Sequence, residues 1–311
     1  MCAVRRIVTR LIALFFSFSA SCAFARAQGA GAQTKPAIFG VLTKTWLSVR
    51  ESPSDLEVAG DLEGLPPEST RYIRRQDLLA LPQTSFTAVH DEKFGEPTPV
   101  SGVPFDELIR ALGRKPGADL VIALAYDGYR STFPAAYVAA HHPLLVLEIN
   151  GKAPAQWPKD AGQGADMRPY TVSYNNFVPS FKVFAHADEQ QIPWGVIRLE
   201  FRNQKSVFGA IEPRGPHAHD AAVQAGYRIA QQNCFRCHNA GGEGGQKSQR
   251  PWLVLAAWAA AAPEFFSAYV RDPKTKNPAA QMPGNRGYDD STMRALTAYF
   301  RTFISVSRGP R

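Results

Sequence analysis

The sequence predicts a multidomain chain in which an α+β domain is followed by an all-α domain. Length is the first reason, because 311 residues exceed the ~150 that one domain typically holds. Strand-like runs are the second reason, since they occur between residues 38 and 201 and then stop. A stretch rich in glycine and proline, 203–219, follows them and is predicted to be the linker. Hydrophobic residues make up 45% of the chain, which is enough for real cores and excludes a disordered protein.

The first predicted domain, residues 28–212, carries more strand than helix. β-Branched or alternating apolar runs predict strands at 56–62, 118–126, 143–150 and 195–201. Between these runs, apolar residues at helical spacing predict short helices at 75–81 and 104–113, and Gly113 is placed to end the second. This mixture indicates an α+β fold.

In the second predicted domain, residues 213–311, helical signals replace the strand signals. Asp220 is placed to cap a helix that leads to a pair of cysteines, and a later helix is predicted to start at Asp290. Between them, the apolar stretch 252–270 is long enough to span a membrane, but Pro263 interrupts it. We therefore expect two short helices there and no membrane span.

Residues 1–27 have the form of a secretory signal peptide. Three arginines precede a short apolar run, 11–20, and small residues follow it in the pattern of a cleavage site. The run is too short to span a bilayer. We expect cleavage and export to the bacterial periplasm. The net formal charge then falls from +8 to +4, because four arginines and no acids are removed.

The exported chain keeps two cysteines, and both lie in the motif Cys234-Phe235-Arg236-Cys237-His238. C-x-x-C-H is the pattern for covalent attachment of a c-type heme. In a helical turn, residues three and four apart share a face, so both thiols can bond to one porphyrin while His238 lies beneath the iron. We therefore predict that Cys234 and Cys237 bind one heme c and that His238 is an axial ligand.

Two other interpretations of the motif are weaker. Paired cysteines can form half of a zinc site, but no further cysteine remains to complete one. They can also form a redox dithiol, but a thioredoxin-like βαβ pattern is absent around them. The histidine directly after the second cysteine favours heme.

A methionine downstream of the motif is the candidate for the second axial ligand. Met282 lies in the loop-like stretch 277–284, and a thioether on the far side of the heme would raise its reduction potential. Met293, in contrast, has the helical spacing of a core residue. His217 and His219 are expected to be solvated.

With this motif, residues 218–305 resemble the class I cytochrome c family. Gly226 and Tyr227 lie on the helix before the motif. Tyr299 lies on the last predicted helix, which in this family crosses the first helix at a glycine. The stretch 264–284 is also similar to the family's approach to its methionine ligand. The resemblance implies an all-helical fold, His/Met ligation and transfer of single electrons. No substrate bond is made or broken in that function, so no general base is required.

The charge of this domain indicates the kind of partner. Residues 216–311 contain twelve basic and six acidic residues, a net charge of +6 before the heme propionates are counted. Complementary charge speeds encounter, so we expect an acidic periplasmic redox protein or dehydrogenase as partner. An ordinary solvated surface explains the charge equally well. The sequence has no nucleic-acid-binding motif.

The front domain resembles the sulfite-oxidase-like molybdopterin domain. The similar segments are, in order, LEVAGDL (56–62), LLALP (78–82), SGVPFDELI (101–109), DGY (127–129) with Ser131, and LEINGKAP (147–154). The resemblance implies an α+β fold that binds a molybdenum cofactor and oxidises or reduces small oxyanions or sulfoxides.

One departure from that family affects the chemistry. The family's metal takes a cysteine thiolate shortly before the segment Gly-Val-Pro, whereas residues 84–95 here contain no cysteine. A neighbouring group cannot replace a thiolate without changing the electronics of the metal. His90 lies near the vacated position and is expected on the surface. The run Asp91–Lys93 is expected to be a solvated loop. The other histidines of this domain have no assigned role: His141, His142 and His186.

Two functions follow from these features. In the first, the front domain has lost its metal and serves for docking, and the chain is a periplasmic monoheme cytochrome that carries electrons for a separate dehydrogenase. In the second, the front domain still binds molybdopterin in an altered form and passes electrons to the heme, as an enzyme of the sulfite-dehydrogenase type. We favour the first, because the missing thiolate is a specific chemical loss. A third function, gas sensing, would require an open axial position on the iron.

Overall fold

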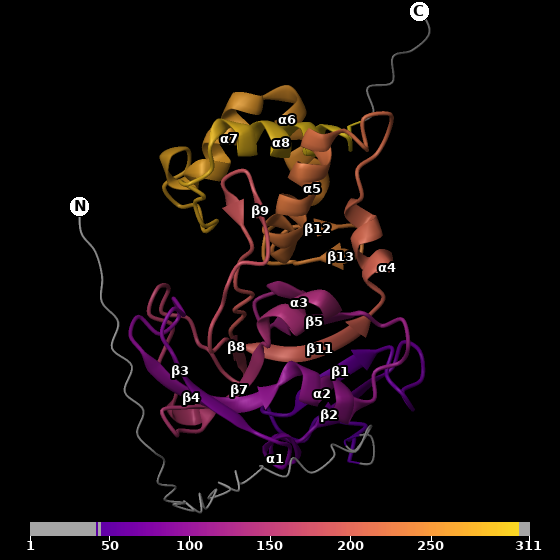
Figure 1. Ribbon diagram of the computed structural model, residues 1–311, viewed down its shortest axis with the longest axis vertical. Helices are drawn as coiled ribbons and strands as arrows, with labels where there is room; N and C mark the ends of the chain where they lie inside the picture. The colour runs from indigo at the N-terminus through magenta and orange to yellow at the C-terminus, as the bar shows by residue number, and fades with distance from the viewer. Residues whose placement is uncertain (1–41, 43–44, 305–311) are drawn as a thin grey trace, which may run out of the picture. The chain divides into compact units, whose positions relative to one another are not determined.

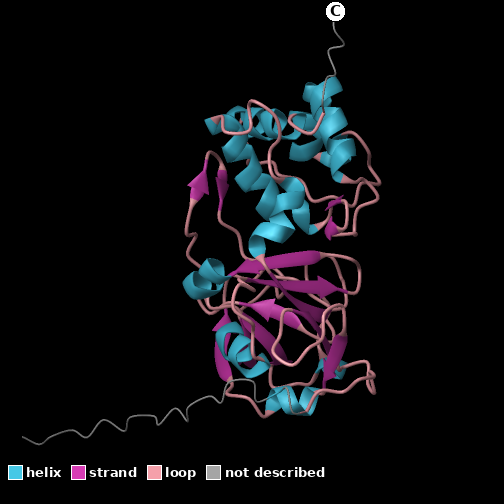
Figure 2. Ribbon diagram, turned by 90° about the vertical axis from the view of Figure 1, so that its right-hand side faces the viewer, coloured by secondary structure: helices cyan, strands magenta, loops and turns pink. Residues whose placement is uncertain are grey.

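Strands dominate the chain up to residue 202, and helices dominate after it (Figures 1 and 2). The computed structural model describes residue 42 and residues 45–304. The order of elements confirms the predicted fold class, an α+β region followed by a helical domain. The predicted signal peptide, 1–27, lies outside the described residues. Within the described ranges, no helix is long and apolar enough to cross a membrane.

The front region (described residues 42 and 45–202) contains eleven strands and three α-helices. The strands are β1 (Leu56–Gly60), β2 (Thr70–Ile73), β3 (Thr84–Ala88), β4 (Thr98–Pro104), β5 (Leu120–Ala125), β6 (Arg130–Pro134), β7 (Leu144–Ile149), β8 (Thr171–Ser173), β9 (Lys182–Val183), β10 (His186–Ala187) and β11 (Val196–Arg202). The helices are α1 (Arg75–Leu79), α2 (Phe105–Leu112) and α3 (Ala135–His141). β1, β5, β7 and β11 confirm the four predicted strands, and α1 and α2 confirm the two predicted helices.

Two sheets organise this region. The larger has the strand order β2-β1-β11-β5-β6, and the smaller has the order β3-β4-β7-β8. β1 pairs with β11 in parallel, and the other neighbours in these sheets are antiparallel. β5 and β6 are joined by a tight turn in which Gly128 takes a positive φ of 83°.

Strand β5 is buried on both faces. Val121 and Ala123 belong to the core of the front region, whereas Leu120 and Ile122 belong to the core of the helical domain. A strand covered on both sides has no polar alternation, which explains the continuous apolar run in the sequence. The described residues 45–304 accordingly belong to one compact unit.

The helical domain is built from short elements. Its helices are α4 (Gln204–Phe208), α5 (Ala221–Gln232), α6 (Trp252–Ala261), α7 (Pro263–Arg271) and α8 (Asp290–Arg301), and two short strands, β12 (Asn239–Ala240) and β13 (Glu243–Gly244), form a hairpin. The predicted break at Pro263 is confirmed. Pro263 is the first residue of α7, where its missing N–H is not needed by the helix.

The segment predicted as a linker, 203–219, is not a loop throughout. Residues 204–208 form α4, and a 3₁₀ turn follows at Gly209–Ile211. Phe208 and Ile211 are buried in the core of the helical domain. Phe208 and Ile211 therefore hold the first half of this segment in the core of the helical domain. Only the second half is a loop, as its glycine and proline residues predict.

The two helix starts predicted in this domain differ in their caps. Asp220 occupies the N-cap position of α5, but its carboxylate accepts a hydrogen bond from His217 Nδ1 at 2.9 Å instead of capping the helix. α8 is capped by Asp289, whose Oδ1 accepts from the Thr292 amide at 2.8 Å.

Helices α5 and α8 cross at Gly226. A Cβ atom at this position would lie 2.1 Å from the Ala295 carbonyl oxygen and 2.7 Å from Cβ of Tyr299. The rings of Tyr227 and Tyr299 lie beside the crossing, with their centroids 5.7 Å apart. The predicted helix crossing at a glycine is therefore present.

The substitution Gly226→Ala is expected to lower the free energy of unfolding by ~1–3 kcal/mol, because the added methyl group would clash with backbone atoms that cannot rotate away. Denaturant unfolding of the purified protein measures this effect. Gly242→Ala is the matched control, since a Cβ there meets nothing within 4 Å. Equal stability of both variants would contradict the tight crossing.

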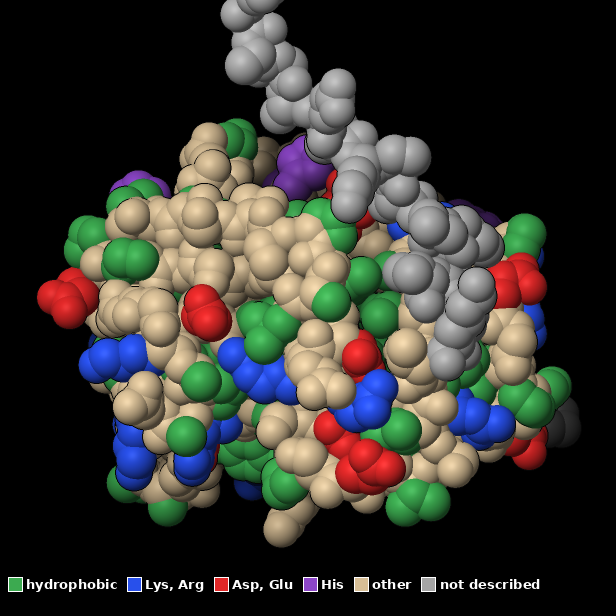
Figure 3. Space-filling model, turned by 90° about the horizontal axis from the view of Figure 1, so that it is seen from below, with side chains coloured by type: hydrophobic (Ala, Val, Ile, Leu, Met, Phe, Trp, Pro, Cys, Tyr) green, Lys and Arg blue, Asp and Glu red, His purple; other side chains and the backbone are tan. Residues whose placement is uncertain are grey.

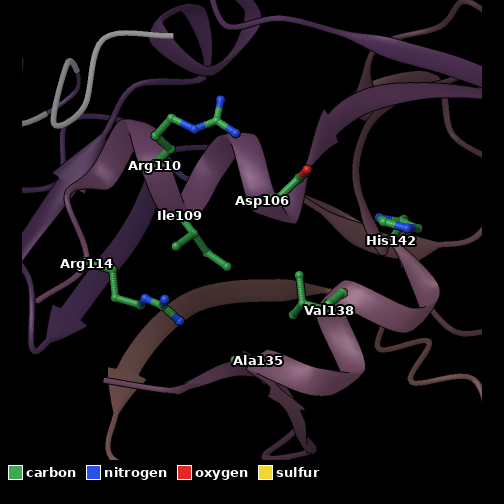
Figure 4. A pocket seen from close by; sticks show the side chains of 8 residues that line it. Asp106, Ile109, Arg110, Arg114, Ala135, Val138 and His142 are labelled. Carbon is green, nitrogen blue, oxygen red and sulfur yellow. The ribbon is translucent and has the colours of Figure 1, made fainter. Parts of the chain in front are cut away.

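A groove of about 510 Å³ lies between α2 and α3 (Figure 4). Asp106 and Arg110 from α2 and His142 after α3 line it. These residues all belong to the front region, and none of them is a predicted ligand of the heme. On the face of the molecule drawn in Figure 3, acidic and basic side chains are interspersed.

Candidate heme site

The Cys-x-x-Cys-His motif forms a helical turn directly after α5. Cys234–Arg236 is a 3₁₀ turn, and the amides of Cys237 and His238 both donate to the Cys234 carbonyl, at 3.2 and 3.1 Å. Both thiols are free and half-buried. The predicted helical turn is present, and it brings the two cysteines and the histidine together.

Burial raises the pKa of both thiols, and that of Cys234 reaches about 12. Among the residues that the structure describes, no group of three or more His, Cys, Asp and Glu side chains could hold a metal ion. The two cysteines therefore have no further ligands beside them that would complete a zinc site.

The imidazole of His238 is oriented by the backbone. It is 8% exposed, and its Nδ1 lies 2.7 Å from the carbonyl oxygen of Arg250. Because a carbonyl can only accept, Nδ1 carries the proton and donates it, which leaves the lone pair on Nε2. Burial also lowers the pKa of His238, which favours the neutral ring. A neutral imidazole with its lone pair on Nε2 is the form that ligates a metal.

Glycines pack the β12–β13 hairpin against the motif. A Cβ at Gly245 would lie 1.8 Å from the Arg236 carbonyl oxygen. At Gly244, with a φ of +90°, it would lie 2.6 Å from the carbonyl oxygen of His238. The Gly245 amide donates to the Phe235 carbonyl at 2.9 Å. The sequence reasoning missed these residues, although the run Gly-Gly-Glu-Gly-Gly at 241–245 was the available signal.

The loop that carries Met282 is tied to the motif. Met282 and Cys234 are both partly buried, and both pack against the core cluster of the helical domain, to which Phe235 belongs. Asn233, which precedes the first cysteine, donates from its Nδ2 to Oδ1 of Asn285 and to the hydroxyl of Tyr288, at 2.8 Å each. The structure therefore places the methionine loop and the motif against the same core cluster and joins them by hydrogen bonds.

The other candidate ligands lie where the sequence predicts them. Met293 is 2% exposed in α8, which confirms that it is a core residue. His217 and His219 are both exposed, as expected. Neither histidine belongs to the buried cluster around the motif.

A comparison with protein-family models agrees with a heme site in this domain. Residues 221–300 match the model of the family described as "Cytochrome C oxidase, cbb3-type, subunit III". These residues form a cytochrome c domain. A c-type heme is therefore its cofactor, and the domain transfers electrons. The match does not say which residues ligate the heme iron.

Comparisons with curated proteins and with solved structures give no further information about the heme site. No curated protein matches the chain. Among solved structures, the chain is similar to the "Crystal Structure of the Sulfane Dehydrogenase SoxCD from Paracoccus pantotrophus", with 18% sequence identity and a TM-score of 0.34. The match covers 55% of this chain and 45% of that one, so this chain spans less than half of the matched relative. A likeness at this level carries no information about activity.

Asp91 and Lys93 are buried, so the prediction of a solvated loop is wrong for these two residues, whereas Glu92 between them is exposed as predicted. Lys93 is 0% exposed, and its Nζ donates to Asp91 Oδ2 at 2.8 Å and to the Val172 carbonyl oxygen at 2.7 Å. The Ser173 hydroxyl also donates to Asp91 Oδ2, at 2.7 Å. Burial lowers the pKa of Lys93, and the neighbouring carboxylate opposes this shift. His90 is exposed, as expected.

These residues do not fit the thiolate-bound metal of the sulfite-oxidase-like family. Residues 28–212 contain no cysteine. In the segment where the family has its cysteine, the buried groups are an ammonium and the carboxylate that it neutralises. The front region therefore offers no thiolate ligand for such a metal.

Two of the three unassigned histidines are buried in a hydrogen-bond network that joins the front region to α5. His141 Nε2 donates to Asp188 Oδ2 at 2.8 Å, and Asp188 Oδ1 accepts from Gln232 Nε2 at 2.5 Å. His186 Nε2 donates to Gln232 Oε1 at 2.8 Å. His142 is exposed. The network ends two residues before Cys234, so the buried histidines support the helix that carries the motif.

The turn after β5 contacts the segment that follows the motif. The Gln246 amide donates to the Gly128 carbonyl at 2.8 Å, and Lys247 Nζ donates to Asp127 Oδ2 at 2.7 Å. A Cβ at Gly128 would lie 3.0 Å from the carbonyl carbon of Gln246. The front region therefore packs closely against the heme-binding segment.

Proposed function

We propose that this chain is an exported, periplasmic monoheme cytochrome that carries single electrons through a heme ligated by His238 and Met282. The observation that carries the proposal is the helical turn with two free thiols and a neutral imidazole whose Nε2 is available. The cytochrome c domain match supports it. The predicted signal peptide supports the compartment.

The chain's own residues perform three tasks in this function. Cys234 and Cys237 would fix the heme through two thioether bonds. The hydrogen bond from His238 Nδ1 to the Arg250 carbonyl holds the imidazole in place and strengthens it as a ligand. Met282 would raise the reduction potential from the other side. The bound heme supplies reversible one-electron chemistry, so no side chain needs to act as an acid or base.

The front region is proposed to serve for docking to a redox partner. Its missing thiol and its neutralised Asp91–Lys93 pair argue against a molybdenum enzyme. Its strand β5 shares a core with the cytochrome domain, which suits a module that presents the heme to another protein.

Metal analysis of the purified protein tests this proposal against the molybdopterin alternative. We expect one equivalent of iron and no molybdenum. Stoichiometric molybdenum, accompanied by a released pterin, would contradict the electron-carrier function and support an enzyme of the sulfite-dehydrogenase type.

An acidic partner is proposed on the basis of exposed cations near the methionine loop. Lys274 and Lys276 are exposed in the chain before Met282, and the Arg286 side chain after it is 80% exposed. A negatively charged partner approaching this loop would be steered by these cations.

The variant Lys274→Glu/Lys276→Glu is expected to be oxidised several-fold more slowly by the anion ferricyanide at low salt. Oxidation by a cationic ruthenium hexaammine should be faster, and both differences should vanish near 1 M salt, where the Debye length is ~3 Å. Stopped-flow absorbance measures these rates. The matched control is Lys152→Glu/Lys159→Glu, which changes two exposed lysines of the front region. Equal rate changes in both variants would contradict a basic docking surface at the methionine loop.

A further inference from the structure

Arg236, which lies between the two heme cysteines, is held by the front region. Its side chain is 13% exposed. Nε donates to the Gln232 carbonyl oxygen at 2.5 Å, Nη1 donates to the Tyr129 hydroxyl at 3.2 Å, and Nη2 forms an ion pair with Glu189 Oε2. Tyr129 and Glu189 both belong to the front region, so this region supplies the counter-ion of a cation in the heme motif.

Glu189 is ionised at neutral pH. Burial alone would raise its pKa, but the adjacent His186 ring and the charge of Arg236 outweigh that effect and lower the pKa to about 2. Oε1 of Glu189 lies 3.4 Å from His186 Nδ1. The Glu189 side chain is 37% exposed, so water screens part of its charge.

The field of this ion pair reaches the positions where the heme would be attached. Arg236 lies in the 3₁₀ turn that begins at Cys234 and directly precedes Cys237, and Glu189 forms an ion pair with its guanidinium. Reduction of the heme adds one electron, so a nearby cation stabilises the reduced form and a nearby anion stabilises the oxidised form. Inside a protein these charges act more strongly than in water.

We propose that Glu189 of the front region sets the reduction potential of the heme by neutralising Arg236. This inference rests on the proposed function, because it needs the heme attached at Cys234 and Cys237. The front region then tunes electron transfer in addition to docking. In this proposal Glu189 does not contact the heme, and it affects the reduction potential only through the charge of Arg236.

Midpoint potentials of the purified holoprotein test this proposal. Glu189→Gln leaves Arg236 uncompensated and is expected to favour reduction at least threefold, a rise of ~28 mV at 59 mV per tenfold for one electron. Arg236→Gln leaves Glu189 uncompensated and is expected to lower the potential by a similar amount. The double variant should return close to the wild-type value. Glu107→Gln is the matched control, since its carboxylate pairs with Arg110 on α2.

An unshifted potential in either single variant that retains heme would overturn the proposal. Loss of heme from both single variants would also overturn it, because the pair would then act on heme retention. Absence of heme from the wild-type protein is a different result, since it would contradict the proposed function itself.

Discussion

Met282→Ala is expected to lower the midpoint potential of the heme by ~0.1 V or more, within the ≈0.8 V range that axial ligands span. The thioether stabilises the reduced iron, so its loss favours the oxidised form. Loss of the sixth ligand should also allow carbon monoxide to bind the reduced protein. A potentiometric titration and an absorbance titration with carbon monoxide measure the two effects.

Met293→Leu is the matched control for this experiment. Met293 is buried in α8, and leucine conserves its volume, so the potential should be unchanged. An unchanged potential in Met282→Ala, with no binding of carbon monoxide, would show that another group ligates the iron.

Lys93→Met is expected to lower the free energy of unfolding by ~3–5 kcal/mol. The substitution keeps the size of the buried side chain but leaves the Asp91 carboxylate, whose side chain is 3% exposed, without its cation. The double variant Lys93→Met/Asp91→Asn should recover most of this loss, because no buried charge is left unpaired. Denaturant unfolding of the three proteins gives the values.

A single variant as stable as the wild type would contradict the buried ion pair. Heme content serves as the second measurement. It should be unchanged in Lys93→Met, since Lys93 contacts the front region and none of the predicted heme ligands.

The heme motif was predictable because covalent attachment requires particular residues at adjacent positions. Cys234, Cys237 and His238 carry that signal in five residues, and the structure places them on one turn. The buried strands were predictable for a similar reason. β5 is a continuous apolar run and β7 is apolar apart from Glu148, as burial of a strand on both faces requires.

The elements that the sequence reasoning missed have weaker local signals. Four of the five residues of β3 are exposed or partly exposed, so the strand shows no apolar pattern and is held by its pairing with β4. α4 was missed because it lies in a segment whose glycine and proline residues predict a loop. Its burial depends on Phe208 reaching a core that residues from distant segments complete.

Buried charges were the hardest feature to predict. Lys93 is buried because it meets the carbonyl of Val172 as well as Asp91, and the first of these partners is 79 residues away. Glu189 likewise meets Arg236, 47 residues away. A local pattern of charged residues resembles a solvated loop, and only the folded chain shows the partners that offset desolvation.

Intact-mass spectrometry of the exported wild-type protein, made together with the heme-attachment machinery, tests the central claim most directly. We predict the mass of the chain without its signal peptide plus one heme, retained after denaturation, with the absorption spectrum of a c-type cytochrome. A colourless protein whose mass equals that of the polypeptide alone would contradict the account.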